Sequence, residues 1–367
     1  MIITEVLVPS QAVAWLPWAV QYFFYIGSAY AAAILFLIAL VFSEHTSHRM
    51  RSAFALTMAI GAIVGPLALT GDLHQPGRAW HFYTHLTPWS WMSLGSLFLP
   101  VFSATTIAAA WLYLRADLIR LQQHPSKVFQ LLSKLSLGDW KTSKNQMLIS
   151  ASIAVLSGLS IALYTGAEIA VVQARSLWHQ PASPIIWFVT AFFGAVGFSL
   201  LITLLIPTRS SDTLSNGDRH LLKRTTSICS VLSLLVLFIW AAGNQSFSLF
   251  DSNQWLLRLS ALFAMIICCF VVAFCTLRTS SKRRFGLAIL SMITLATAWA
   301  VRWVTMIDVQ TIPKFDLGPY PYELPMGGSG LLGIFGMFGL WMALALLGSE
   351  LVQTEQQSSS QSLLSEQ

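Results

Sequence analysis

Charged residues are scarce in this sequence. They make up 10% of its 367 positions, whereas apolar residues make up 55%, and a soluble domain usually carries about 25% charged residues. So small a polar fraction cannot cover a globular surface in water, and the mean hydropathy of +0.66 places the chain in a lipid bilayer. The net charge of +6 therefore indicates membrane topology rather than nucleic-acid binding.

Ligands for metal centres are equally sparse. None of the cysteines forms a C-x-x-C pair, which argues against an iron–sulfur cluster bound by this chain alone; all of them lie in apolar runs, at Cys229, Cys268, Cys269 and Cys275. The eight histidines fall in connections between apolar runs, whereas haem b needs axial histidines on facing helices. We predict a chain with no haem, no iron–sulfur cluster and no other metal site.

Carboxylates near the middle of the apolar runs are also missing. All 15 acidic residues fall in connections, tails or the ends of runs. Pumps and transporters usually place ionisable groups near the bilayer midplane, so an ion path made of carboxylates is not expected.

Nine apolar runs are long enough to cross a membrane, since a spanning helix needs roughly 20 apolar residues. They lie near residues 18–43, 52–71, 90–114, 147–166, 184–206, 224–243, 255–277, 285–304 and 328–349.

Basic residues mark alternate connections between these runs. Of the 21 Lys and Arg residues, 16 fall on one side, and positively charged connections stay in the cytoplasm. This asymmetry predicts a periplasmic N-terminus and a cytoplasmic C-terminus, with residues 351–367 as a disordered tail. Eleven of the 14 tryptophans map to the other side. They can form an ordinary interfacial belt, or they can cover a buried site or a docked partner.

Polar side chains gather where the runs end on this tryptophan-rich side. Such groups can hold a quinol head group by its two hydroxyls and accept its protons. The candidates are Gln21 in the first run, Asp72, His74, Arg78 and His81 at and after the end of the second, and Tyr164 and Glu168 at the end of the fourth.

Structural roles are open for the same residues. Asp72 and Arg78 can form an ion pair that fixes the connection, and the histidines can make ordinary hydrogen bonds within it. Tyr164 can belong to an aromatic belt. Arg302 is expected at the same outer end, on the eighth run.

The segment PLALTGDLHQPGRAWHFYTHLTPWSWMSLGSLFLP (66–100) resembles the NrfD/polysulfide-reductase family of quinol-oxidising membrane subunits. Four further blocks are similar to one branch of that family, which serves reductases of sulfur compounds. They are WLPWAVQYFF (15–24), YTGAEIAVVQARSLW (164–178), RWVTMIDVQTIPKF (302–315) and GIFGMFGLW (333–341).

The resemblance implies a subunit that oxidises menaquinol or ubiquinol without a cofactor of its own. Its electrons would pass to a periplasmic ferredoxin-like subunit with [4Fe–4S] clusters, and a molybdopterin subunit would reduce the substrate. The family's quinol pocket lies at the periplasmic end of the first four helices, where Tyr164 is the counterpart of a family tyrosine. The family often reads Asp-Leu-Gly-x-Pro after the second helix, whereas this chain reads Asp72-Leu73-His74-Gln75-Pro76, so His74 is either a ligand or a spacer.

We therefore expect an all-α protein of the bacterial inner membrane, with two four-helix bundles and one extra helix. Residues 1–180 would form the first bundle with the quinol site, and residues 181–350 the second half with five helices. Catalytic roles fall to Asp72, Tyr164 and Glu168. A related subunit serving polysulfide, thiosulfate or another acceptor, a non-catalytic anchor and a secondary transporter remain as alternatives.

The placement of the histidines generates a spectroscopic prediction. The purified chain should show no Soret band and should contain no bound iron by elemental analysis, because no pair of histidines can face each other across a helical bundle. A haem spectrum in stoichiometric amount would contradict this assignment.

Overall fold

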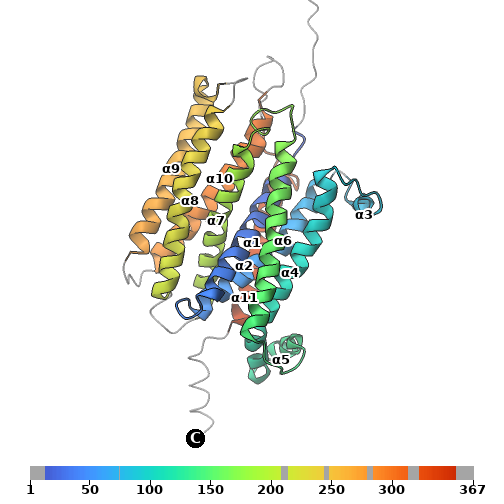
Figure 1. Ribbon diagram of the computed structural model, residues 1–367, viewed down its shortest axis with the longest axis vertical. Coiled ribbons are helices and arrows are strands. Elements are labelled where there is room, and N and C mark those ends of the chain that lie inside the picture. The colour runs from blue at the N-terminus through green and yellow to red at the C-terminus, as the bar shows by residue number, and fades with distance from the viewer. Residues whose placement is uncertain are drawn as a thin grey trace, which may run out of the picture.

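The computed structural model describes residues 13–73, 75–207, 214–243, 248–278, 284–312 and 322–352. In this part of the chain nine helices are long and apolar enough to cross a membrane, and they run side by side along the long axis of the molecule (Figure 1). The nine predicted runs are thereby confirmed. The helices are α1 (Pro17–Val41), α2 (His48–Asp72), α4 (Trp91–Arg120), α6 (Lys144–Ala170), α7 (Ala182–Leu205), α8 (Asn216–Ala242), α9 (Asn253–Thr276), α10 (Arg284–Trp303) and α11 (Leu331–Leu351).

Several helices extend beyond the apolar runs that predict them. α2 begins at His48 and α8 at Asn216, because Ser47 and Ser215 accept hydrogen bonds from the backbone amides of Met50 and Asp218. Such caps satisfy amide groups that have no partner inside the helix, so a polar first turn can precede the apolar segment. Hydropathy alone does not detect these turns.

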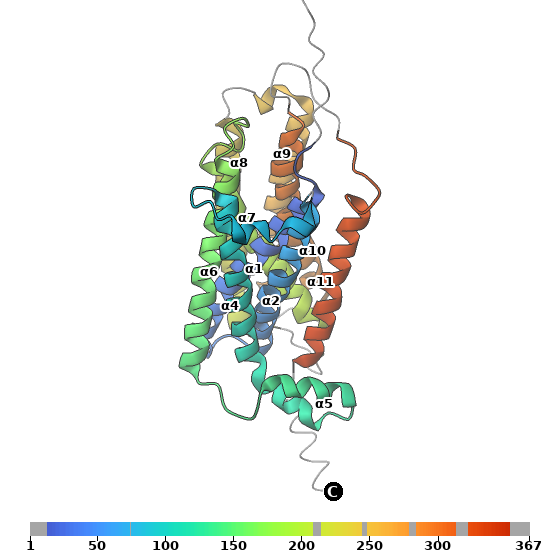
Figure 2. The same cartoon turned by 90° about the vertical axis from the view of Figure 1, so that its right-hand side faces the viewer.

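Helix packing produces the expected two bundles and one extra helix. α1, α2, α4 and α6 pack together, as do α7, α8, α9 and α10, and α1 packs against α7. α11 contacts α2 and α7 and lies along the outside of the molecule (Figure 2). Of the apolar windows of α1 and α7, 78% is buried, against 28% for α4, α6, α9 and α11, so α1 and α7 form the centre of the fold.

Small residues allow α1 to approach its neighbours closely. A Cβ atom on Gly61 of α2 would lie 2.8 Å from the carbonyl oxygen of Tyr25, and one on Gly65 would lie 3.3 Å from the backbone nitrogen of Ile26. In lipid, where no hydrophobic force joins two apolar helices, such close backbone packing is a main source of association.

Arg302 lies in the last turn of α10, at the outer end of the span as expected, but its side chain is buried inside the helical assembly. The helix continues past it as the π-helical segment η5 (Val304–Asp308), and the side chain is 1% exposed. Its guanidinium donates to the carbonyl oxygens of Phe23 at 2.9 Å, Ala298 at 2.9 Å and Trp187 at 3.3 Å. Arg302 therefore connects α1, α7 and α10.

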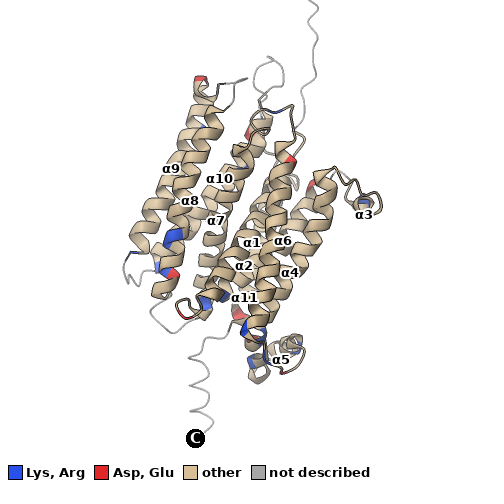
Figure 3. Cartoon of the chain, viewed as in Figure 1, with Lys and Arg blue, Asp and Glu red and all other residues tan. Residues whose placement is uncertain are grey.

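The two ends of the assembly differ in composition. Between α4 and α6 the chain forms η2 (Leu121–Gln123), α5 (Lys127–Ser133) and η3 (Lys134–Ser136), and Lys and Arg gather at the end that carries α5 (Figure 3). We call this the basic end. The opposite end, where α1 begins and α6 ends, carries η1 (Pro76–Arg78) and α3 (His81–Thr84), and we call it the tryptophan-rich end.

The contact between α1 and α2 predicts the effect of one added methyl group. Gly61→Ala should lower the free energy of unfolding by about 1–3 kcal/mol, the usual cost of overpacking, because the Tyr25 backbone cannot rotate away. Thermal denaturation followed by helical circular dichroism measures this effect. As a matched control, Gly339→Ala on α11 should be neutral or slightly stabilising, since nothing lies within 4 Å of its added Cβ. Equal melting temperatures of the two variants would contradict the packing described.

Candidate functional site

Tyr164 lies near the tryptophan-rich end of α6 with its side chain buried, at 3% exposure. Its ring rests directly on Gly95 of α4, where any Cβ atom would overlap the ring carbons. The absence of a side chain at Gly95 thus sets the place of the phenol between α4 and α6.

Tyr22 of α1 and Glu168 of α6 are the electrostatic neighbours of Tyr164. All three side chains are at least nine-tenths buried. We refer to Tyr22, Tyr164 and Glu168 as the tyrosine–glutamate cluster. It combines two phenols, which can donate or accept a hydrogen bond, with one carboxyl group.

The hydroxyl of Tyr22 is buried without a hydrogen-bond partner. The hydroxyl of Tyr164 is close enough to interact with it, but the two do not form a hydrogen bond of normal geometry. An unsatisfied buried polar group costs about 1–3 kcal/mol, so such groups need an explanation. Other buried side-chain atoms without a hydrogen-bond partner, among the described residues, belong to Gln21, Thr226, Ser230, Ser233, Tyr322 and Trp341. Tyr22 is notable because a carboxyl group, that of Glu168, lies beside it.

Asp72 lies at the margin of the cluster, as the last residue of α2. Its Oδ1 accepts a hydrogen bond from the backbone amide of Leu16 at 3.1 Å, and it is close enough to interact electrostatically with Glu168. The ion pairs among the described residues join His48 and Arg120 to Asp117, and Arg258 to Asp308. The Asp72–Arg78 pair considered from the sequence is not among them.

Gln21 is fully buried, and both polar atoms of its amide lack a partner. Successive helical residues point roughly 100° apart, so Gln21 faces a different side of α1 from Tyr22. Trp18, three residues before Gln21 on the same face, packs on Gly71 of α2 and Gly333 of α11. Gln21 therefore lies on the face of α1 next to that of Tyr22.

Arg78 and His81 lie in the exposed segment between α2 and α4. They line a shallow hollow together with His85 and Ser93. Ser93 lines this hollow, and Gly95, two residues further along α4, contacts the ring of Tyr164. His74 lies outside the described residues.

Aromatic side chains pack together at the tryptophan-rich end, between the start of α1 and η5. Trp15 lies 5.5 Å from the ring of Phe23 and 6.0 Å from that of Trp178, and the indole of Trp178 donates to the carbonyl oxygen of Thr305 at 2.6 Å. Arg175 donates to the carbonyl oxygen of Val309 at 2.9 Å, and burial lowers the pKa of its guanidinium below the usual value. These contacts tie the start of α1 to η5.

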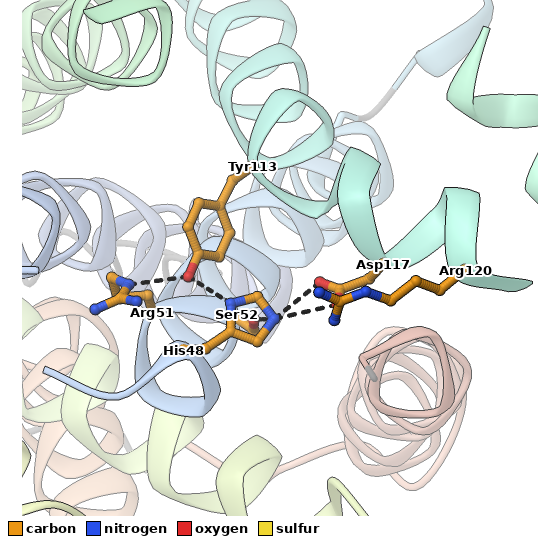
Figure 4. A network of polar contacts seen from close by, with 6 residues as sticks. All are labelled: His48, Arg51, Ser52, Tyr113, Asp117 and Arg120. Atoms are coloured by element: carbon orange, nitrogen blue, oxygen red, sulfur yellow. Dashed lines mark hydrogen bonds and ion pairs between the residues drawn. The ribbon is translucent and has the colours of Figure 1, made fainter. Parts of the chain in front are cut away.

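A second polar network lies at the basic end, and sequence reasoning missed it. His48, expected in a connection, is the first residue of α2. Its Nε2 lies 3.0 Å from Asp117 Oδ2, and its Nδ1 lies 2.8 Å from the hydroxyl of Tyr113 (Figure 4). Arg51 donates to the same hydroxyl at 3.0 Å. These groups satisfy one another, so the network holds α2 against α4.

Tyr22 and Gly95 also escaped prediction from the sequence. Tyr22 lies inside the block WLPWAVQYFF, and Gly95 lies inside the segment 66–100, so both belong to the regions of family resemblance. The missing information is the rotation of α1 and α4, which brings Tyr22 and Gly95 to Tyr164.

Nine spans among the described residues, two bundles and a buried polar cluster at one end define a multi-pass membrane protein. The family described as "Polysulphide reductase, NrfD" matches residues 5–314, and the chain belongs to this family. It is 37% identical over 360 residues to a tetrathionate reductase subunit of Salmonella typhimurium, covering 95% of this chain and 94% of the relative. It is 22% identical over 329 residues to a selenate reductase subunit of Mesobacillus selenatarsenatis, covering 83% of this chain and 75% of the relative. The chain is thus a membrane subunit of a reductase complex.

The contact between Gly95 and Tyr164 predicts a coupled effect on stability. Gly95→Ala should destabilise the protein, because the new methyl group displaces the buried ring. In a Tyr164→Leu background the same substitution should be close to neutral. A double-mutant cycle by thermal denaturation should give a coupling of roughly 0.5–3 kcal/mol; additive effects would show that the ring does not rest on Gly95.

Proposed function

We propose that this chain oxidises quinol at the tyrosine–glutamate cluster and is the membrane subunit of a tetrathionate reductase. The observation that carries the proposal is the buried hydroxyl of Tyr22. It has no hydrogen-bond partner, and the carboxyl group of Glu168 lies near it. A quinol hydroxyl is a partner of suitable chemistry, since it both donates and accepts. Binding sites that leave polar groups unpaired until the ligand arrives are common at functional positions.

Quinol oxidation releases two electrons and two protons and leaves the quinone. Tyr22 and Tyr164 can hydrogen-bond a quinol oxygen, and Glu168 is the general base that accepts a proton from it. Asp72, at the edge of the cluster, would pass protons outward to water. Gln21 on the next face of α1, with Arg78 and His81 in the exposed segment, would line the approach to this cluster. His74, which lies outside the described residues, stays a candidate quinol ligand from the sequence.

The electrons would leave to a periplasmic ferredoxin-like protein that holds [4Fe–4S] clusters. This partner would dock at the tryptophan-rich end, and a molybdopterin subunit would reduce the substrate there. The concentration of basic residues at the other end supports an orientation with the N-terminus in the periplasm and the C-terminus in the cytoplasm. The name of the 37% identical relative supports tetrathionate as the terminal acceptor.

The unpartnered hydroxyl predicts that activity and stability separate in one variant. Tyr22→Phe should slow quinol oxidation on the order of 3- to 10-fold, the value of one net hydrogen bond of about 0.5–1.5 kcal/mol. It should leave the melting temperature unchanged or raised, because no bond is lost in the resting protein. The measurements are quinol-dependent tetrathionate reduction by the assembled complex and thermal denaturation of the same preparation.

Tyr113→Phe is the matched control at the basic end. Its hydroxyl contacts His48 and Arg51, so this variant should lose stability while quinol affinity is retained. Normal turnover of a correctly assembled Tyr22→Phe complex would remove Tyr22 from the site.

A further inference from the structure

A short helical segment lies at the basic end of α4. It comprises η2, α5, η3 and the residues up to Trp140, and in Figure 2 it runs across the direction of the spanning helices. We call residues 121–140 the α5 platform. None of the residues proposed for quinol oxidation lies in it.

The platform is firmly attached to α4. Arg115 is 1% exposed and donates to the carbonyl oxygens of Ser136 at 2.8 Å and Gly138 at 2.7 Å. Its guanidinium carbon lies 3.4 Å from the ring centroid of Trp140. A second bond runs from the indole of Trp111 to the carbonyl oxygen of Leu135 at 2.8 Å. A buried cation thus fixes the position of a surface segment.

Although fixed, the platform leaves large aliphatic side chains uncovered. Val128 is 65% exposed, Leu131 62%, Leu135 55% and Leu137 70%. The first three recur at intervals of three and four residues, so they share one face. This aliphatic face is not covered by the rest of the protein. An exposed aliphatic face on a fixed helical segment is typical of a helix that lies in a membrane interface.

Cations surround this aliphatic face. Exposed basic side chains flank it at Arg120, Lys127, Lys134, Lys141 and Lys144. Asp117 pairs with His48 and Arg120, and none of the ion pairs among the described residues involves a lysine. The lysines are therefore available to an anionic partner.

We propose that the α5 platform binds anionic phospholipid. Val128, Leu131, Leu135 and Leu137 enter the boundary between head groups and acyl chains, and the lysines hold the head-group phosphates. Because Arg115 fixes the platform to α4, lipid bound here also fixes the depth of the bundle that carries the tyrosine–glutamate cluster. The lipid is one with a net negative head group, such as phosphatidylglycerol.

The test measures contact between the platform and defined lipids in the full-length chain. Leu131→Cys is labelled with an environment-sensitive fluorophore after the exposed Cys268 and Cys275 have been replaced by serine. The protein is placed in phosphatidylcholine nanodiscs that contain either spin-labelled phosphatidylglycerol or spin-labelled phosphatidylcholine at the same mole fraction. Each lysine near an anionic surface contributes about 1 kcal/mol, or roughly a fivefold preference, so phosphatidylglycerol should quench several-fold more strongly.

Variants that remove positive charge test whether the lysines of the α5 platform cause the preference for phosphatidylglycerol. Substituting Lys127, Lys134 and Lys141 together by glutamine should lower the quenching ratio several-fold toward one, because only Lys144 and the Asp117-paired Arg120 remain, with quenching by phosphatidylcholine retained. Lys223→Gln with Arg224→Gln, which removes charge elsewhere at the same end, should leave the ratio unchanged.

Three results would overturn the proposal. No quenching by either lipid would show that the platform faces water or a protein. Equal quenching by both would show that it has no preference for anionic head groups. A preference that survives the triple substitution would assign it to other residues.

Discussion

The contact between α1 and α7, closed by Arg302, holds the two bundles together. A charged guanidinium in a membrane protein is expensive unless it is fully hydrogen-bonded, and Arg302 meets this condition with carbonyl oxygens from α1, α7 and α10. Arg302 donates to the carbonyl oxygen of Phe23, the residue that follows Tyr22 in α1. The interaction that joins the bundles therefore also fixes the rotation of α1, and with it the direction in which Tyr22 points.

The two ends of the first bundle differ in how completely their polar side chains are hydrogen-bonded. At the basic end, the imidazole of His48, the carboxylate of Asp117 and the hydroxyl of Tyr113 satisfy one another. At the tryptophan-rich end, the hydroxyl of Tyr22 and the amide of Gln21 lack partners. The first arrangement stabilises the fold, and in the proposed function the unpartnered groups of the second would bind the quinol. The unpaired groups lower the free energy of unfolding locally, and helix packing elsewhere in the bundle offsets this loss.

Hydropathy was sufficient to predict the nine spans, because each carries enough apolar residues to cross a bilayer whatever its neighbours are. Resemblance to the family pointed to Tyr164, and the end of the same helix pointed to Glu168. The rotation of the helices could not be predicted in the same way. α1 is apolar on all sides, so its sequence has no polar stripe to show which face meets α6, and Tyr22 went unnoticed beside Gln21. Arg302 was expected at the end of its helix, and it lies in the last turn of α10. Its burial was not predicted, because hydropathy does not show that η5 continues the span beyond it.

The central proposal is that quinol binds between α1, α4 and α6 at the tryptophan-rich end. Photo-crosslinking of the full-length chain in lipid with a photoreactive quinone analogue, followed by peptide mapping, tests this proposal directly. The label should appear on peptides that contain Tyr22, Gly95 or Tyr164, and excess natural quinone should compete for it. A competed label confined to the basic end, or to α8 and α9 of the second bundle, would place the quinone elsewhere and contradict the proposal.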